Sequence, residues 1–204
     1  MPIWDEVNAQ FADTDIMRFL AEKPVPMMRT MVESGMNAPL ASSCGRLFDA
    51  VAAALGLYRE KVAFEAQAAI ALEQSATACF ERESDHYEYG ISEENECLKL
   101  GWQPMWLALL NDLQNGAETG VIAARFHRTL IHALSAIARR LCNQHGANSV
   151  ALSGGVFQNR LISTHLPHAL QQAGLQVLQH AQVPAHDGGI SLGQAVTAAA
   201  RKIG

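Results

Sequence analysis

The chain has 204 residues, of which 49% are hydrophobic and 17% charged, and its formal net charge is −5. This length allows one domain or two small lobes, and the composition excludes an intrinsically disordered chain. No apolar stretch approaches the roughly 20 residues that cross a bilayer, and no basic block exceeds the pair Arg139–Arg140, so we expect neither membrane nor nucleic-acid binding.

The first forty residues are predicted to form an N-terminal helical extension, ahead of a lobe at residues 41–204. Apolar residues recur at helical spacing in residues 13–23 and again in residues 27–36. The second helix is rich in methionine, which suits a docking face but is more often flexible core filler. The start of the chain lacks the basic and apolar segments of a secretory signal, so we expect a cytoplasmic protein with reduced thiols.

The middle of the chain is predicted to be mainly helical. Ser43 can cap a helix that Gly56 ends, and Pro104 suits the first turn of another. Helices are predicted over residues 46–57, 62–80, 104–113 and 121–145.

Strands are predicted in two places. Residues 87–91 and 96–100 have the pattern of a β-hairpin. In the last sixty residues, strands at 149–153 and 175–178 are each followed by a glycine-containing loop or turn and a helix. This β-α-β-α order is typical of a parallel sheet whose carboxyl ends face a ligand crevice.

The first of these strands passes into its helix through Ser153, Gly154 and Gly155. Glycines at such a turn allow backbone N–H groups to approach an anion. Asn159, one helical turn later, could reach the same crevice. The alternative is a tight turn that packs helix against sheet, and a glycine pair alone is weak evidence against it.

A second glycine-bracketed turn, Asp187–Gly188–Gly189, follows the next strand. The two turns should lie side by side at one edge of the sheet, which favours a crevice for phosphate and metal. Asp187 could bind a cation that bridges phosphate oxygens, or it could cap the final helix, which is the more common local role. His186 is the one histidine that we place near a site.

Asp49 is a third candidate, because it is a lone carboxylate in an otherwise apolar helix. It could bind a ribose hydroxyl, or it could pair with Arg46 three residues earlier. The other histidines form no HxxxH or HExxH motif, and the four cysteines form no CxxC pair. The sequence therefore encodes no local zinc or redox motif.

Three segments of the sequence, taken together, resemble those of a known protein family. They are Ser42–Ala52 (SSCGRLFDAVA), Leu152–Arg160 (LSGGVFQNR) and Val183–Ala195 (VPAHDGGISLGQA). In this order and spacing, the chain resembles the C-terminal part of the HypF hydrogenase-maturation carbamoyltransferases, a family related to the tRNA threonylcarbamoyl transferases. The resemblance extends from about Met28 to the end of the chain.

The resemblance implies an α/β fold, the helix-rich half of the actin/sugar-kinase/Hsp70-like (ASKHA) architecture, with a short mixed sheet and β-α-β-α at the C-terminal end. It also implies a reaction. ATP and carbamoyl phosphate yield carbamoyl-adenylate, whose carbamoyl group passes to the C-terminal cysteine of a HypE-like acceptor protein. The product supplies the cyanide ligands of [NiFe] hydrogenase.

The same resemblance implies roles for particular residues. Nucleotide contacts are implied for Gly45, Asp49, Gly154, Gly155 and Asn159, with Asp49 at the ribose and the glycine pair at the phosphates. Asp187 matches a ligand of one divalent metal ion (iron, zinc or magnesium), which makes metal binding the preferred prediction over a cap. No catalytic residue is assigned, because the attacking sulfur belongs to the acceptor.

Several departures from the family predict an incomplete site. The histidine pair that completes the metal site has no match here, nor do the acylphosphatase, zinc-finger and adenylate-forming modules. Ala66 replaces a usual glycine, His186 a common asparagine, and Cys44 a small residue or methionine. An added Cβ at position 66 would hinder a close nucleotide contact. We therefore expect a truncated chain or a fragment that is inactive alone and needs the missing HypF lobe or modules.

Two further functions stay open. One is a degenerate docking or dimerisation module, which Ala66 and the methionine-rich start favour. The other is an O-carbamoyltransferase of the antibiotic or nodulation-factor type, which the segment 45–52 fits less well. Apolar surface that normally meets another lobe also predicts a homo-oligomer.

Overall fold

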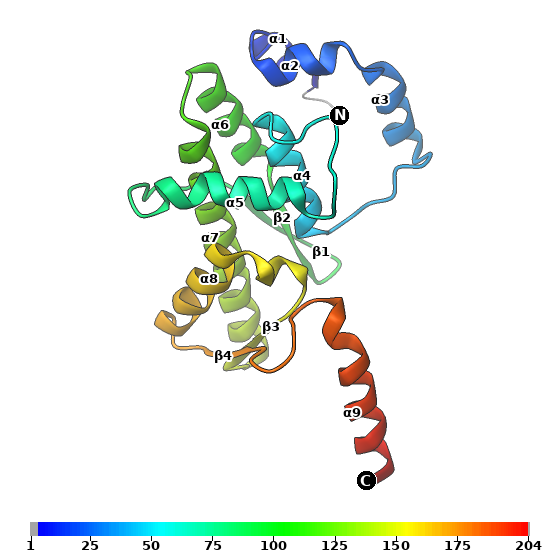
Figure 1. The fold of residues 1–204 in the computed structure, drawn as a ribbon, viewed down its shortest axis with the longest axis vertical. Coiled ribbons are helices and arrows are strands. Elements are labelled where there is room, and N and C mark those ends of the chain that lie inside the picture. Colours follow the sequence, from blue (N-terminus) through cyan, green and yellow to red (C-terminus); the bar gives the residue numbers. More distant parts are fainter. Residues whose placement is uncertain (1–3, 204) are drawn as a thin grey trace. The chain divides into compact units, whose positions relative to one another are not determined.

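A computed structural model describes residues 4–203 of the chain, and it divides into two compact units, residues 1–129 and 130–204. The boundary between the units falls within the long helix α7 (Figure 1). The start of the chain, from which we predicted the lack of a secretory signal, lies partly outside the described residues. The helix-rich α/β class with small sheets is confirmed.

The first unit is mainly helical and contains one hairpin. Its elements are α1 (Trp4–Gln10), α2 (Asp15–Ala21), α3 (Val25–Ser34), α4 (Cys44–Ala54), α5 (Gln67–Phe80), β1 (Gly90–Glu94), β2 (Cys97–Gly101), α6 (Gln103–Gln114) and the first part of α7 (Thr119–His145). The second unit begins within α7. Its further elements are β3 (Ser149–Leu152), the 3₁₀ helix η1 (Gly155–Gln158), α8 (Arg160–Gln172), β4 (Gln176–Gln179), the 3₁₀ helix η2 (Asp187–Gly189) and α9 (Ile190–Ile203).

Helix α4 begins and ends where its capping residues allow. The Ser43 side chain accepts a hydrogen bond from the Arg46 backbone N–H at 3.4 Å, and Gly56 has a φ of +78° just beyond the helix. Both features follow the usual chemistry of helix ends. The short helix α1 was not predicted.

Helix α5 begins five residues later than predicted, at Gln67, because Ala66 has a left-handed backbone with φ +62°. A left-handed conformation costs a residue with a Cβ roughly 1–2 kcal/mol, whereas glycine adopts it freely. Helix α5 therefore begins next to a strained residue, at the position where the resemblance led us to expect glycine.

The core of the first unit depends on close approach between α5 and α7. A Cβ built on Gly120 would lie 2.8 Å from Cys79 Sγ and 2.9 Å from the Ser75 carbonyl oxygen, so a larger residue would push the helices apart. Further along α7, Phe126 and His127 both pack edge-on against Phe48 of α4, with ring centroids 5.0 and 5.3 Å apart. Small and aromatic side chains together fill this core.

A polar network ties the chain before the hairpin to α6 and α7. Arg125 forms ion pairs with Glu83 at 3.0 Å and with Asp112 at 2.8 Å. Tyr87 donates its hydroxyl to the same Asp112 carboxylate at 2.8 Å, and its burial raises the pKa of that hydroxyl. Each of these charges has a partner, as partly buried charges require.

The hairpin is confirmed, but its first strand lies three residues later than predicted and its second strand one residue later. Strands β1 and β2 pair antiparallel with Gly90 opposite Gly101, and the turn consists of Asn95 and Glu96. Both turn residues have positive φ, which matches the right-handed twist of the strands. Within residues 4–203 the hairpin and the β3–β4 pair are separate two-stranded sheets, one antiparallel and one parallel, so they do not form the predicted short mixed sheet.

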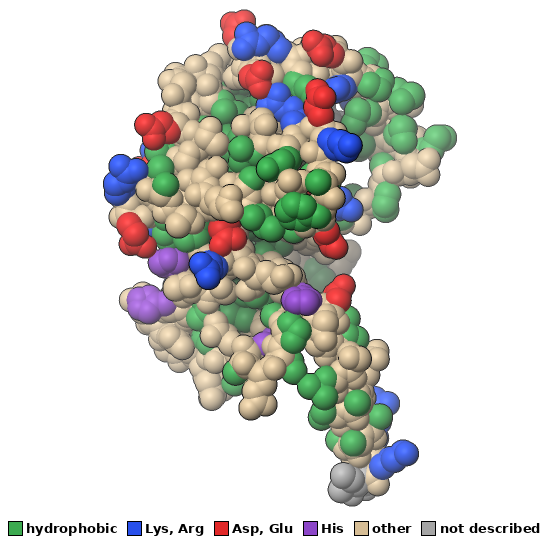
Figure 2. Space-filling model, in the orientation of Figure 1, with side chains coloured by type: hydrophobic (Ala, Val, Ile, Leu, Met, Phe, Trp, Pro, Cys, Tyr) green, Lys and Arg blue, Asp and Glu red, His purple; other side chains and the backbone are tan. Residues whose placement is uncertain are grey.

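The second unit contains the predicted parallel pair. Strand β3 runs parallel to β4 with Ser149 beside Gln176, and α8 connects them. Helix α8 buries Ile162, Leu166 and Leu170, whereas residues 191–200 of α9 are all exposed. Hydrophobic side chains lie along the visible side of α9 (Figure 2).

Among the described residues, no helix combines the length and apolarity that crossing a membrane requires.

The strain at Ala66 predicts that Ala66→Gly stabilises the protein. Ala66 is exposed, so the change removes no buried contact, and we expect the free energy of unfolding to rise by about 1 kcal/mol. Ala78→Gly is the matched control, since Ala78 is exposed inside α5 and the same change there should cost about 1 kcal/mol. Urea unfolding measures both variants, and equal signs for the two would contradict the prediction.

The buried His127 predicts a loss of stability in acid. Burial lowers the pKa of His127 from 6.5 to about 4, although its Nδ1–H bond to the Ala123 carbonyl opposes that shift. The unfolded chain takes up a proton below pH 6.5 and the folded chain does not until about pH 4. The contribution of neutral His127 to the free energy of unfolding is therefore fully present above pH 6.5. It is lost as the pH drops toward 4, and the loss reaches about 2 kcal/mol at pH 5.

Urea unfolding at pH 7.5 and at pH 5 tests this expectation. His168→Gln should keep the full pH dependence, because His168 is exposed, and His127→Gln should flatten it. A wild-type chain that is equally stable at both pH values would show the prediction to be wrong.

Candidate functional site

The two glycine turns of the second unit meet at the carboxyl ends of β3 and β4. The Gly154 backbone N–H donates to the Ala185 carbonyl oxygen at 2.7 Å, and the Ser153 hydroxyl reaches the same oxygen at 3.4 Å. Ala185 belongs to the loop that carries Asp187. The structure therefore brings together the two turns that the sequence predicted to lie side by side.

The glycines of the first turn face open space. Gly154 has a φ of +110°, and a Cβ built on it would meet no atom within 4 Å, while one on Gly155 would meet only Gln158 Nε2 at 3.9 Å. The positive φ explains glycine at position 154. Among the residues that the structure describes, no packing explains Gly155, whose exposed backbone leaves room for a ligand.

The glycines of the second turn are held by packing instead. A Cβ on Gly189 would lie 2.6 Å from the Pro184 carbonyl oxygen, and one on Gly188 would lie 3.0 Å from the His186 ring. Gly189 is therefore required for the turn to close.

Asn159 is buried, with 9% of its surface exposed, and its side-chain oxygen accepts the Ile162 backbone N–H at 3.0 Å. It is the N-cap of α8. This hydrogen bond fixes the start of α8 next to the glycine turn, so a structural role is established for Asn159, and a nucleotide contact stays a prediction.

Capping at the second turn is done by His186, whose Nδ1 accepts the Gly188 N–H at 3.2 Å. The cap of η2 is therefore His186 rather than Asp187. The Asp187 side chain is exposed and forms no ion pair with the described residues. Its carboxylate can accept a ligand, as the family motif implies.

Metal binding by this chain alone is not supported by the donor set. Within residues 4–203, no three histidine, cysteine, aspartate or glutamate side chains are close enough to hold an ion together. Divalent ions need several such ligands in a defined geometry. Asp187 fits a site only as one ligand among others.

The remaining predicted residues belong to the first unit, at the start of α4. A Cβ on Gly45 would meet only Ser43 Oγ, at 3.6 Å, so its exposed face is open. Asp49 is half-exposed rather than buried, and its carboxylate lies 3.9 Å from the Arg46 guanidinium. Both of its predicted roles remain compatible with this position, because an exposed ion pair at that distance is weak.

Cys44 lies at the start of α4 and is partly buried. Burial raises the pKa of its thiol to about 11, so almost none of it is thiolate. This thiol is therefore poorly suited to supply the attacking sulfur, which the resemblance assigns to the acceptor.

Sequence reasoning missed His180, the residue after β4. Its Nε2 lies 3.0 Å from Ser153 Oγ, so it reaches the end of the neighbouring strand. The only available signal was its position at the carboxyl end of a predicted strand, where ligands bind in parallel sheets.

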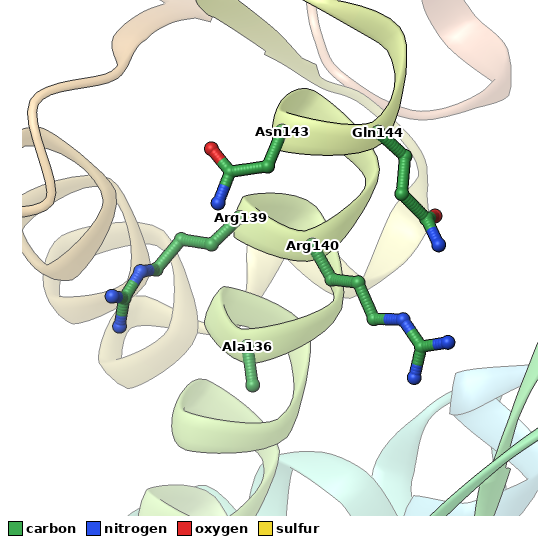
Figure 3. A pocket seen from close by; sticks show the side chains of 5 residues that line it. All are labelled: Ala136, Arg139, Arg140, Asn143 and Gln144. Carbon is green, nitrogen blue, oxygen red and sulfur yellow. The ribbon is translucent and has the colours of Figure 1, made fainter.

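A shallow hollow of about 470 Å³ lies on α7 of the second unit (Figure 3). Arg139 and Asn143 extend to one side of the helix, Arg140 and Gln144 extend to the other, and Ala136 lies nearer the start of the helix. None of the predicted site residues lines it.

Comparison with known proteins identifies the family. A family model described as "Carbamoyltransferase, Kae1-like Domain, second subdomain" matches residues 4–194. Carbamoyltransferase HypF of Rhodobacter capsulatus is 37% identical over 90% of this chain, and the Carbamoyltransferase HypF homolog of Cupriavidus necator is 36% identical over 88% of it. The chain covers 23% and 46% of these two relatives.

Solved structures give the same result. A crystal structure of full-length HypF in the phosphate- and nucleotide-bound form matches with a TM-score of 0.82 and 35% identity, over 96% of this chain and 25% of that one. HypF of T. kodakarensis matches with a TM-score of 0.64 and 28% identity, over 81% of this chain and 20% of that one. The chain belongs to the HypF carbamoyltransferase family, and corresponds to the C-terminal part of those enzymes.

Proposed function

We propose that this chain supplies nucleotide contacts and one metal ligand for carbamoyl transfer from carbamoyl-adenylate to the C-terminal cysteine of a HypE-like acceptor. The observation that carries the proposal is the hydrogen bond from the Gly154 N–H to the Ala185 oxygen, which joins the two motif turns. A relative of known structure was crystallised in a phosphate- and nucleotide-bound form, which supports a nucleotide as the ligand.

In this proposal the open backbone at Gly155, in the second unit, lets the adenylate phosphate approach. For Asp49, in the first unit, we propose separately a hydrogen bond from a ribose hydroxyl, on the family resemblance alone. Gly45 leaves room beside Asp49. Asn159 acts indirectly, because its cap on Ile162 holds the turn in place. The thiol of the acceptor attacks the carbamoyl carbon and AMP leaves.

Asp187 would be one ligand of a divalent metal ion, and the other ligands would come from enzyme residues outside this chain. When bound, such an ion neutralises phosphate charge as AMP departs. The chain spans between about a quarter and about half of the relatives compared above, so the whole reaction requires further parts of the enzyme, in the same or in another polypeptide. The ASKHA architecture and a cytoplasmic location belong to the same proposal.

A docking or dimerisation module is the second candidate. It is favoured by the exposed apolar side chains of α3, which include Met27, Met28 and Val32, and of α9, which include Leu192 and Val196. Surfaces of this kind are typical of contacts with other proteins. A homo-oligomer is one form that such docking would take.

The two glycine turns predict that one alanine substitution weakens ligand binding and that another weakens the fold. Gly155→Ala should leave the free energy of unfolding within about 0.5 kcal/mol of the wild type, because its Cβ meets open space, but should weaken AMP binding. Gly189→Ala should destabilise the fold by roughly 1–3 kcal/mol through its clash with the Pro184 oxygen. Urea unfolding and AMP titration separate the two, and unchanged AMP affinity in Gly155→Ala would contradict a phosphate at this turn.

The proposed catalytic role predicts a loss of transfer in Asp187→Asn. The variant is tested in this chain combined with the remainder of a HypF enzyme, and carbamoylation of a HypE-like acceptor is measured together with bound metal. We expect transfer to fall at least tenfold and the metal content to drop, because a neutral amide is a poorer ligand.

Asp13→Asn is the matched control, since Asp13 is exposed in the loop before α2 and the charge change is the same. It should leave both readouts unchanged. Normal transfer and normal metal content in Asp187→Asn would reject the metal-ligand role and favour the docking module. Robust transfer by this chain alone would reject the expectation that it holds only part of the site.

A further inference from the structure

The second unit contains a hydrogen-bonded pair that no motif predicted. Ser153 lies at the end of β3 and His180 at the end of β4, and their side chains are linked at 3.0 Å across the parallel sheet. Both residues are exposed, so a ligand at this edge can reach them.

The hydrogen bonds around Ser153 differ in strength. The Ala185 carbonyl oxygen already accepts the Gly154 N–H at 2.7 Å, and the Ser153 hydroxyl reaches that oxygen only at 3.4 Å, near the limit for a hydrogen bond. The donor in the Ser153–His180 pair depends on the imidazole tautomer. In the Nε2–H tautomer His180 donates to Ser153 Oγ, and the hydroxyl proton is left for the Ala185 oxygen. In that tautomer the imidazole holds a hydroxyl whose own proton is only weakly engaged.

An anionic oxygen would be a better acceptor for this proton. Hydroxyl bonds to charged oxygens are about 2.5–2.7 Å long and roughly twice as strong as neutral ones. The open face of Gly155 lies two residues from Ser153, so there is room for a phosphate beside the hydroxyl.

We propose that Ser153 donates a hydrogen bond to the phosphate of the bound nucleotide and that His180 is the positioning residue that orients its hydroxyl. This inference rests on the proposed function and adds to it a phosphate contact made by a side chain. His180 acts through Ser153 and is not itself a catalytic residue.

The test compares AMP with adenosine, which share the base and the ribose and differ only in the phosphate. Wild-type chain is titrated with each ligand at millimolar concentration and followed by the NMR signals of His180 and the glycine turns. We expect AMP to bind more tightly than adenosine. Ser153→Ala should reduce this preference about tenfold without changing adenosine affinity, because a hydrogen bond to a charged group is lost.

Variants of His180 test whether this residue orients the Ser153 hydroxyl or only stabilises the fold. His180→Ala should reduce the AMP preference roughly fivefold, and His180→Gln should restore most of it, because the glutamine amide N–H can replace Nε2–H. Ser149→Ala, at the opposite end of β3, and His168→Ala, on the exposed face of α8, are controls that should bind both ligands like the wild type. Unfolding midpoints are measured for all variants.

The outcomes distinguish this inference from the function on which it rests. A full AMP preference in Ser153→Ala would overturn the phosphate contact and leave the proposed function standing. A full preference in His180→Ala, or no rescue by His180→Gln, would overturn the positioning role. Wild-type chain that binds neither ligand would overturn the nucleotide contacts of the proposed function, and this inference with them.

Discussion

The candidate site depends on one backbone hydrogen bond, from the Gly154 N–H to the Ala185 carbonyl oxygen. The loops after β3 and β4 are far apart in sequence, and a two-stranded sheet offers few contacts to hold them together. This bond fixes the first turn against the second. Because Gly154 has a φ of +110°, only glycine can present its N–H in this way without strain.

Patterns that act over short distances predicted most of the fold. The serine cap and Gly56 set the limits of α4, and the alternation of strands with helices predicted the parallel pair β3–β4. The same alternation predicted that Gly154 and Asp187 lie in neighbouring loops. These features were predictable because caps, turns and right-handed crossovers depend on local residues and on few alternatives.

Other features depend on contacts that a sequence does not display. The hairpin register was set by the turn at Asn95 and Glu96, two residues that rarely adopt positive φ together. The start of α5 depends on a strained Ala66, where local propensity favours a continued helix. His180 was missed because its importance comes from Ser153, twenty-seven residues away in the chain.

The two candidate functions are physically connected through α9. Asp187 begins the 3₁₀ turn that leads directly into this helix, and residues 191–200 of the helix are exposed. A helix of about 14 residues is only marginally stable in water without packing. A surface that covers the apolar side of α9 would therefore stabilise the helix and, through it, the position of the Asp187 carboxylate. Under both proposals, a partner that covers α9 would also stabilise the turn that carries Asp187.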